Sequence, residues 1–395
     1  MEKRAVLIGH NYNSILSIAR ALGENGYAID VIRTGASNQK GLKTIGEFFD
    51  SKCRYIDRFM IASSKKPEEI IKILLGEYKS DAAKSVLFPI DDIAAELIDN
   101  SLDVLKDHYY LPNIRMTQGQ IVKVMDKHFQ KQLAREVGLL SPNGVSVELS
   151  HGTYTLPDSI TFPCFARPET SFNGRKKYMK RCDNEQELKA LLDKTAAFTD
   201  CSMLIEDLIE IEREYCIVGL CNKDKVCIPD MIEETVMGHD NHAGVTCYGR
   251  LLSPDNHLEF INKLKEFLAR LDFQGLFTVD VMESKGKLYF CEINMRMGAS
   301  GAAVLISGVN LALMFANIIR GDRSVDYDVV CRQLTFANEK PLINDYANRH
   351  ISWKEYKDYL KKADIRFILS DKDMKPYHNY LLYELKLRIK RLVKR

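Results

Sequence analysis

The sequence predicts an α/β domain followed by an α+β domain and a small C-terminal extension. Residues 4–9 and 28–32 read as buried strands on either side of a helix with apolar residues at helical spacing, which is typical of a doubly wound domain. Near residues 112–117 this alternation ends, and hairpin patterns follow it. We therefore expect domains at 1–115 and 116–325, with an extension at 326–395.

The composition is that of an ordinary globular protein. Of the 395 residues, 46% are apolar and 28% are charged, and a net charge of +2 gives no reason to expect nucleic-acid binding. The ten cysteines form no CxxC pair and no zinc-type cluster, which favours a reducing, cytoplasmic setting. The opening apolar run is too short for a signal peptide. Residues 301–319 predict a buried helix, because polar residues interrupt a membrane-span pattern.

In the first domain, the turn GHNYNS (9–14) is not a GxGxxG motif, so a dinucleotide site is unsupported. We expect Asn13 or Ser14 to cap the following helix, with an anion at that helix end as the alternative. Asp91 and Asp92 follow the strand at 85–89 and predict the cap of a helix that runs to about residue 105. They also stand where ligands bind in α/β domains, at the carboxyl end of a strand.

Two cations stand out early in the second domain. Asp126 predicts a helix N-cap, and Lys127 lies in the first turn, where the helix dipole disfavours a cation. A nearby anion would explain Lys127, and the alternative is an ordinary solvated lysine. The strand at 161–167 ends in Arg167, and the basic loop at 168–177 could either close over phosphates or form a simple hairpin.

Polar residues also mark the next strands. Glu206 and Glu214 bracket the connection between the strand at 202–209 and the hairpin that begins at residue 215; they could bind a ligand or pair with Arg213. Residues 237–249 read as a polar loop. Its His239, Asp240 and His242 favour a structural or substrate-contact role over zinc binding.

The hairpin at 273–301 carries acids where a core strand would carry apolar residues. Glu292 and Asn294 share one strand face, and the hairpin can bring Asp280 beside them. Two carboxylates and an amide oxygen suit a hard cation such as Mg²⁺. The alternative is a solvated hairpin face in which these acids pair with Lys287 or Arg296.

The chain ends in a basic amphipathic helix within YLLYELKLRIKRLVKR (380–395), whose apolar residues fall on one face. Two partners fit this pattern equally well. One is an anionic membrane surface, and the other is protein, either the body of the chain or a second subunit.

Taken in order, these pieces resemble the ATP-grasp superfamily of carboxylate–amine ligases over residues 4–320. The strand with Glu292, Asn294 and Arg296 is similar to the family's E-x-N-x-R pattern, and GHNYNS and PIDD are similar to the D-aspartate ligase and carbamoyl phosphate synthetase branch. The resemblance implies an ATP-grasp fold with an N-terminal Rossmann-like domain, a lid subdomain at about 128–200 and a small C-terminal extension.

The resemblance also implies a nucleotide site built from dispersed residues. The implied ATP contacts are Lys127 and Arg167 on the phosphates, Ser171 and Gly174 in a mobile lid loop, Glu206 on the adenine amino group, Leu208 on the ring edge and Glu214 on the ribose. Two Mg²⁺ ions, for which Mn²⁺ can substitute, would be held by Asp280, Glu292 and Asn294, and Arg296 would stabilise the transferred phosphoryl group. Three departures are an arginine at 167 in place of lysine, a single glycine in the lid, and one extra residue between Glu206 and Glu214.

The implied activity is ATP- and Mg²⁺-dependent ligation. A carboxylate is activated as an acyl phosphate and joined to an amine, both small molecules, and the basic tail suits a cell-envelope or glycan acceptor. The alternatives are an ATP-grasp kinase that stops at phosphoryl transfer and a non-catalytic ATP-binding regulatory module. A homodimer, cytoplasmic or peripheral at the inner face of the membrane, is expected.

Overall fold

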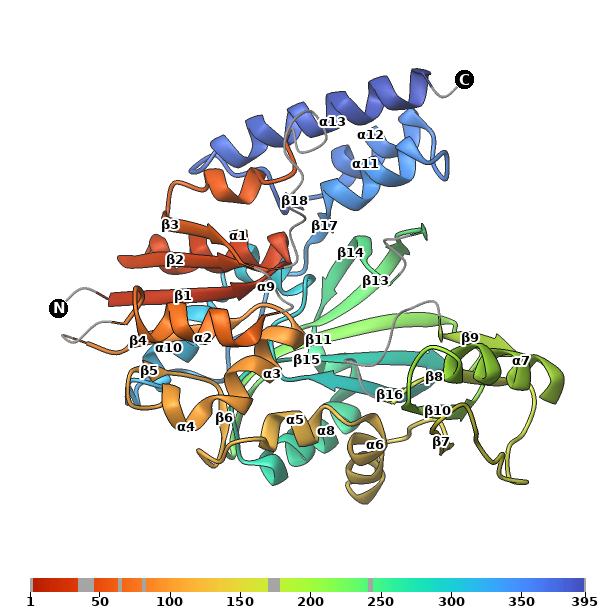
Figure 1. Ribbon diagram of the computed structural model, residues 1–395. Coiled ribbons are helices and arrows are strands. Elements are labelled where there is room, and N and C mark those ends of the chain that lie inside the picture. The colour runs from red at the N-terminus through yellow and green to blue at the C-terminus, as the bar shows by residue number, and fades with distance from the viewer. Residues whose placement is uncertain are drawn as a thin grey trace.

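The structure, a computed structural model, describes residues 3–34, 46–62, 66–79, 83–169, 178–240 and 244–393. It contains three sheets, of five, four and nine strands. Figure 1 shows the N-terminal sheet at the left, the four-stranded sheet at the right, and long strands of the largest sheet between them. This arrangement agrees with the predicted combination of α/β and α+β parts.

The N-terminal sheet is parallel, with the order β3-β2-β1-β4-β5, so the direction of winding reverses between β1 and β4. Its elements are β1 (Lys3–Gly9), α1 (Tyr12–Gly23), β2 (Tyr27–Arg33), η2 (Phe49–Lys52), β3 (Ile56–Ile61), α2 (Pro67–Leu75), β4 (Ser85–Pro89), α3 (Asp92–Asn100), α4 (Leu102–Leu105) and β5 (Tyr109–Tyr110). The single helix predicted after Asp92 is two helices, because Ser101 leaves the helical conformation (φ −118°, ψ 15°).

One predicted helix cap in this domain is wrong and one is confirmed. The side chain that caps α1 belongs to Asn11, and not to Asn13 or Ser14. Its Oδ1 atom accepts hydrogen bonds from the backbone N–H groups of Asn13 and Ser14 at 3.0 and 3.3 Å. Asp91 caps α3 as predicted, accepting from the Ala94 N–H at 2.9 Å.

The four-stranded sheet has the antiparallel order β7-β10-β8-β9. It consists of β7 (Gly144–Leu149), β8 (Cys164–Pro168), β9 (Lys180–Cys182) and β10 (Cys201–Asp207), and α7 (Glu185–Ala196) packs its leucines on it. This unit therefore spans 144–207, whereas the lid was expected at about 128–200. The predicted lid residues Ser171 and Gly174 lie outside the described residues.

The nine-stranded sheet runs β16-β15-β11-β13-β14-β17-β18, with β12 beside β11 and β6 beside β15. Its strands are β6 (Asn113–Ile114), β11 (Arg213–Asn222), β12 (Lys225–Cys227), β13 (Met231–Met237), β14 (Thr246–Leu252), β15 (Phe273–Ser284), β16 (Lys287–Asn294), β17 (Thr335–Ala337) and β18 (Ile365–Arg366). The loop expected at 237–249 is shorter than predicted, because β14 begins at Thr246.

Helices cover this sheet and continue into the extension. They are α5 (Gln120–Val124), α6 (Lys127–Glu136), η5 (Pro254–His257), α8 (Leu258–Leu271), α9 (Gly301–Ser307), α10 (Leu311–Ile318), α11 (Glu339–Ala347), α12 (Trp353–Lys362) and α13 (Lys375–Val393). The predicted buried helix at 301–319 is two helices, α9 and α10. Within the described residues no single helix is long and apolar enough to span a membrane; α9 and α10 pass that test only as a pair, across a 91° bend.

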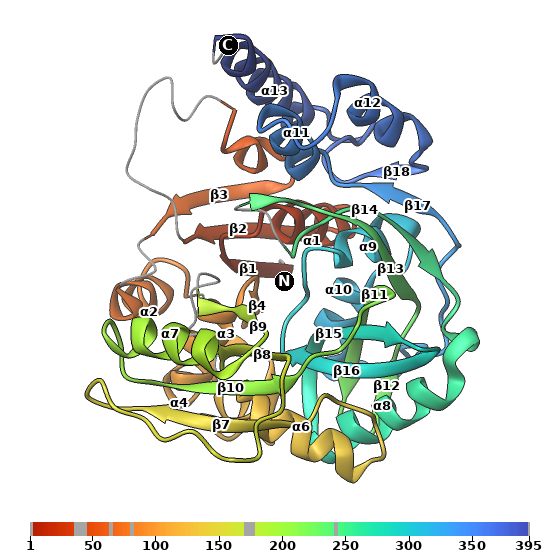
Figure 2. The same ribbon diagram turned by 90° about the vertical axis from the view of Figure 1, so that its right-hand side faces the viewer.

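The extension joins the largest sheet. Strand β17 pairs antiparallel with β14, and β18 pairs parallel with β17. Helix α13 lies beside α11 (Figure 2) and also packs against η2 of the N-terminal domain. Its Tyr380, Tyr383 and Leu387 are buried in the core shared with that domain. The C-terminal segment therefore bridges the first domain and the largest sheet.

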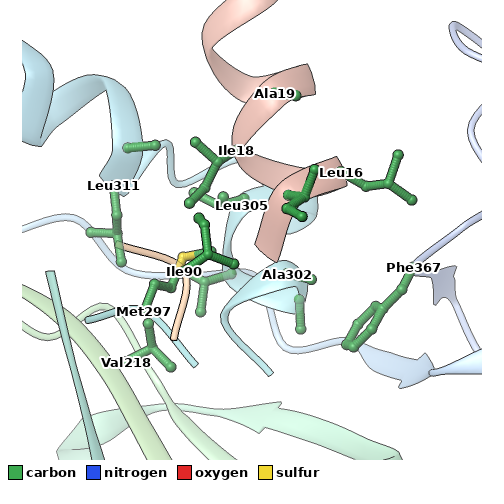
Figure 3. Packing of buried hydrophobic residues seen from close by; sticks show 14 of the residues in the cluster. Leu16, Ile18, Ala19, Ile90, Val218, Met297, Ala302, Leu305, Leu311 and Phe367 are labelled. Atoms are coloured by element: carbon green, nitrogen blue, oxygen red, sulfur yellow. The ribbon is translucent and has the colours of Figure 1, made fainter. Parts of the chain in front are cut away.

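One apolar core joins the N-terminal domain to the largest sheet. Figure 3 shows Ile90 beside Met297 and Val218, with Leu16 and Ile18 of α1 facing α9. All five side chains are almost completely buried. Such close packing fixes the relative position of the two domains.

Phe315→Ala is expected to destabilise both domains together. Phe315 of α10 is 1% exposed and meets Phe88 of β4 edge-on, with ring centroids 5.4 Å apart. Loss of a buried phenylalanine costs about 3–5 kcal/mol, which urea unfolding would measure. The control is Phe198→Ala, at a ring that is 70% exposed, with an expected cost below about 1 kcal/mol. If urea unfolded the protein in two separate steps, and Phe315→Ala shifted the midpoint of only one of them, the shared core would be contradicted.

Candidate functional site

The predicted hairpin brings its polar residues together. In the β15–β16 ladder, Asp280 lies opposite Glu292 and Thr278 lies opposite Asn294, with an irregularity in register just after Asp280. Residues directly opposite each other in a ladder share one face of the sheet. The two carboxylates and the amide therefore converge, as expected from the sequence.

Glu292 is the meeting point of three structural units. Its Oε2 atom accepts a hydrogen bond from Nη1 of Arg167 on β8 at 3.0 Å, and Nζ of Lys127 on α6 lies 3.5 Å away. Burial alone would raise the pKa of Glu292, but Lys127 and Arg167 lower it, so the carboxylate stays ionised. Lys127 is thus a buried partner of an anion, and the solvated-lysine alternative is wrong.

A second buried carboxylate, Glu206 of β10, extends this cluster. Its Oε2 accepts from Nε of Arg167 at 2.7 Å, and its Oε1 pairs with Nζ of Lys131. Burial and the nearby Arg167 lower the pKa of Lys131 to about 7, against the opposing effects of Cys291 and Glu292. Lys131 was not predicted as a site residue, although its place four residues after Lys127 puts it on the same helix face.

Asp280 belongs to a row of acids across neighbouring strands. Burial raises its pKa well above the usual range, and Glu292 and Glu234 raise it further. Glu234 of β13 accepts hydrogen bonds from the hydroxyls of Thr246 and Ser300, and its pKa is raised by burial and then by Glu214. Sequence reasoning missed Glu234 because β13 had not been recognised as a strand beside β11.

The donor set suits a hard cation. Buried carboxylates that raise one another's pKa lose that repulsion when a divalent ion lies between them, and Mg²⁺ takes oxygen ligands. No group of three or more His, Cys, Asp or Glu side chains with metal-binding geometry occurs in the described part of the chain. The predicted metal-binding set is not such a group, because it contains only two carboxylates and its third donor is the amide oxygen of Asn294.

Arg296 reaches across the domain boundary. Its Nε and Nη2 atoms donate to the two carboxylate oxygens of Asp92 at 2.9 and 3.2 Å, a bidentate ion pair. Asp92 is the first residue of α3 and lies at the carboxyl end of β4. This strand end, where the sequence suggested that a ligand could bind, therefore does face the site. In the alternative of a solvated hairpin face, the acids pair with Lys287 or Arg296. Glu292 pairs instead with Lys127 and Arg167.

Gln130 of α6 holds the outer side of β16 in place. Its side-chain amide donates to the carbonyl of Ile293 at 2.8 Å and accepts from the N–H of Ile293 at 2.9 Å. It also donates to the carbonyl of Val124 at 2.8 Å. A buried amide that pairs with a strand in this way fixes the backbone between Glu292 and Asn294.

The remaining predicted residues have varied surroundings. Leu208 follows β10 directly, and Glu214 is half-buried on β11 with a pKa raised by burial. Arg213 pairs with Glu283 and Glu233, not with Glu206 or Glu214. In the loop after β13, His239 pairs with Asp345 and Asp240 with His350, which agrees with a structural role; His242 lies outside the described residues.

Comparison with known proteins identifies relatives of this arrangement. The family model described as "Carbamoyl-phosphate synthase L chain, ATP binding domain" matches residues 126–324. A D-alanine–D-alanine ligase of Thermoanaerobacter sp. (strain X514) is 25% identical over 281 residues, which are 60% of this chain and 77% of that protein.

Two solved structures share the fold. The L-amino acid ligase from Bacillus licheniformis superposes with a TM-score of 0.63 at 14% identity, covering 85% of this chain and 80% of that one. The biotin carboxylase domain dimer of the Hydrogenobacter thermophilus 2-oxoglutarate carboxylase, in complex with MgADP, ADP and bicarbonate, gives 0.64 at 16% identity, covering 85% and 74%.

Nucleotide and metal are expected to bind with positive coupling. Without nucleotide, Lys127 and Arg167 neutralise Glu292, so Mg²⁺ must compete with two cations. Phosphates that pair with those cations would release Glu292, and couplings of this kind are about 5–150-fold. Calorimetry should therefore show ATP binding more tightly with Mg²⁺ than with EDTA, and weak Mg²⁺ binding alone.

The Glu292→Gln variant should lose most of this coupling, because an amide does not replace a carboxylate as metal ligand. Glu259→Gln, on the exposed face of α8, is the matched control and should keep it. Tight Mg²⁺ binding by the nucleotide-free protein would contradict the assignment.

Proposed function

The chain belongs to the carbamoyl-phosphate synthase ATP-binding-domain family of ATP-grasp ligases, and we propose that it joins an amino-acid carboxylate to an amine with release of ADP and phosphate. The observation that carries the proposal is the buried cluster in which Lys127, Arg167 and Glu292 meet, with Asp280 opposite. Cations and acids gathered in one buried place suit a phosphate chain with its metal ion.

The chemistry follows from what a carboxylate lacks. Its leaving group would be oxide, so attack by an amine does not proceed until ATP converts it to an acyl phosphate. The chain contributes little covalent chemistry; its cations stabilise charge that develops on the transferred phosphoryl group. Arg296 would contact that group or the acyl phosphate, and its ion pair with Asp92 at the domain boundary supports this role.

We propose the nucleotide contacts that the resemblance implies. Lys127 and Arg167 would bind the phosphates, and Ser171 and Gly174 would belong to the lid. Glu206, Leu208 and Glu214 would contact the adenine and the ribose. For Glu206, the ion pairs with Lys131 and Arg167 support an additional role, since they hold a phosphate-binding cation in position.

Asp280, Glu292 and Asn294 would hold Mg²⁺, and Mn²⁺ would substitute for it because both accept oxygen ligands. When bound, the metal would neutralise charge on the phosphates. The MgADP present in the structurally similar biotin carboxylase domain supports this choice. A homodimer stays a prediction, to be tested by light scattering.

We also propose that α13 contacts a membrane surface, which would suit an acceptor carried by the cell envelope. Its outer face exposes an apolar row of side chains that are 50–65% exposed, namely Leu382, Leu385, Ile389 and Leu392. Cations lie along the same helix, with Lys390 exposed. The opposite face is buried against the body of the chain through Tyr380 and Tyr383. One face of α13 thus packs on protein, and the other face would meet the membrane.

The ligase activity predicts that ADP release needs both reactants. Pooled amino acids supplied with amine-bearing envelope precursors should give ADP and an amide product of matching mass, whereas either pool alone should not. Arg296→Met should lower kcat by about 10²–10³, the usual effect of removing one stabilising donor. Stoichiometric ADP release with the carboxylate pool alone, together with a stable phosphorylated product, would favour the kinase alternative.

Membrane contact predicts flotation with anionic vesicles of mixed phosphatidylcholine and phosphatidylglycerol, and much less with pure phosphatidylcholine. The double variant Leu385→Glu/Ile389→Glu should reduce partition by about tenfold or more, since each apolar side chain contributes about 1.5–3 kcal/mol when buried. Leu258→Glu, at an exposed leucine of α8, is the control. Unchanged flotation, or a change of oligomeric state in the double variant, would contradict membrane docking. Point substitutions are preferable to removal of 380–395, because Tyr380 and Tyr383 are part of the core.

A further inference from the structure

His10 and Asp91 form a hydrogen-bonded pair at the boundary of the first domain. The Oδ2 atom of Asp91 lies 2.5 Å from Nδ1 of His10 and also accepts the backbone N–H of His10 at 2.8 Å. The other carboxylate oxygen accepts from the Ala94 N–H. The Asp91 side chain is 10% exposed, whereas that of His10 is 58% exposed.

The backbone is shaped to allow this pair. Gly9 has φ +143°, and a Cβ atom there would lie 2.7 Å from Oδ2 of Asp91. Only glycine therefore lets the carboxylate approach the end of β1. The pair sits at the carboxyl ends of β1 and β4, where the strand order reverses, and this is the position at which open α/β sheets bind their ligands.

The pair is also adjacent to the proposed phosphoryl-transfer site. Asp91 bonds His10, and the next residue, Asp92, holds Arg296. Burial lowers the pKa of Arg296, but Asp92, Asp280 and Asp91 outweigh that effect and raise it, so Asp91 lies within electrostatic reach of Arg296. Ser14 of α1 also donates to the carbonyl of Gly298, in the loop that follows Arg296, at 3.3 Å.

The geometry selects the tautomer of the neutral imidazole. The contacts with His10 and the cap to Ala94 lower the pKa of Asp91 against the effect of burial, so Asp91 is ionised. In the neutral imidazole, an ionised acceptor requires Nδ1 of His10 to carry the single proton, and the lone pair is then on Nε2. In the described part of the chain no hydrogen-bond partner occupies Nε2. A base oriented by a carboxylate and open on its other side is the arrangement used in general-base catalysis.

We propose that His10 is the general base for the amine reactant, a role that rests on the proposed ligase function. Nε2 of His10 takes one proton from the ammonium form of the amine. The freed nitrogen lone pair then attacks the acyl carbon, a C–N bond forms, and the C–O bond to phosphate breaks with its electron pair on the phosphate. The departing phosphate takes the second nitrogen proton. Asp91 acts as a positioning residue that holds the tautomer.

The test compares two nucleophiles in His10→Gln, which keeps a donor for Asp91 but cannot act as a base. With ATP, Mg²⁺ and a mixture of amino acids, hydroxylamine traps the acyl phosphate as hydroxamate; it is uncharged at neutral pH and needs no proton removed before it attacks. Wild-type protein should form hydroxamate and, when the amine-bearing envelope precursors replace hydroxylamine, amide. The variant should keep hydroxamate formation and lose about 10²–10⁴-fold in amide formation.

The loss should shrink as pH rises, because more of the amine is already deprotonated. The charged groups beside the pair are Asp91 at the N-cap of α3, Asp92 in its first turn, and Arg296, which donates to Asp92. His108→Gln, in the same domain before β5, is the matched control and should match wild type in both reactions.

Three outcomes would overturn the proposal. Equal losses of hydroxamate and amide in His10→Gln would indicate a structural role. No loss in either reaction would exclude His10 from the step. If wild-type protein forms no hydroxamate although calorimetry shows ATP binding, the ligase function fails, and the role of His10 fails with it.

Discussion

The carboxylate of Glu292 connects the parts of this protein on which its chemistry depends. Lys127 comes from α6, Arg167 from the four-stranded sheet, and Glu292 from the outermost strand of the largest sheet. Buried charges are stable only when they are paired, so these three units have a preferred relative position even without substrate. The same ion pairs hold Lys127 and Arg167 where they can bind phosphate. An incoming nucleotide must therefore displace the carboxylate of Glu292 from these two cations.

Two kinds of contact around the site stabilise its geometry. The apolar core around Ile90, Val218 and Met297 fixes the N-terminal domain against the largest sheet, which allows Asp92 to reach Arg296. Gln130 holds the free side of β16 where a neighbouring strand would otherwise lie. Rigid apolar packing therefore sets the distance between domains, and directional hydrogen bonds set the orientation of the reactive side chains.

The sequence was informative where the controlling physics is local. The hairpin with Asp280 and Glu292 could be predicted because strand residues alternate between faces and a short turn fixes their register. The caps at Asp126 and Asp91 follow from the same kind of local rule. The order of these pieces along the chain then sufficed to indicate the family.

What could not be predicted depends on contacts between distant segments. Glu234 enters the site only because β13 pairs with β11, and Asp92 meets Arg296 across 204 residues of chain. Asn11 was overlooked as a cap in favour of Asn13 and Ser14, a choice decided by where α1 begins against its neighbours. The position of Lys131 on the same helix face as Lys127 could be predicted from their spacing. Its ion pair with Glu206 could not, because Glu206 lies on a distant strand.

Strand β17 changes how the C-terminal segment should be regarded. Because it pairs with β14, and because α13 packs on η2 near the other end of the chain, residues 335–393 cannot be exchanged between relatives as an independent module. A chimaera joined after α10 would leave β14 with an open edge and expose backbone groups that readily pair with other chains. Recombination that respects this architecture would carry the extension, β13 and β14, and the N-terminal domain from one parent.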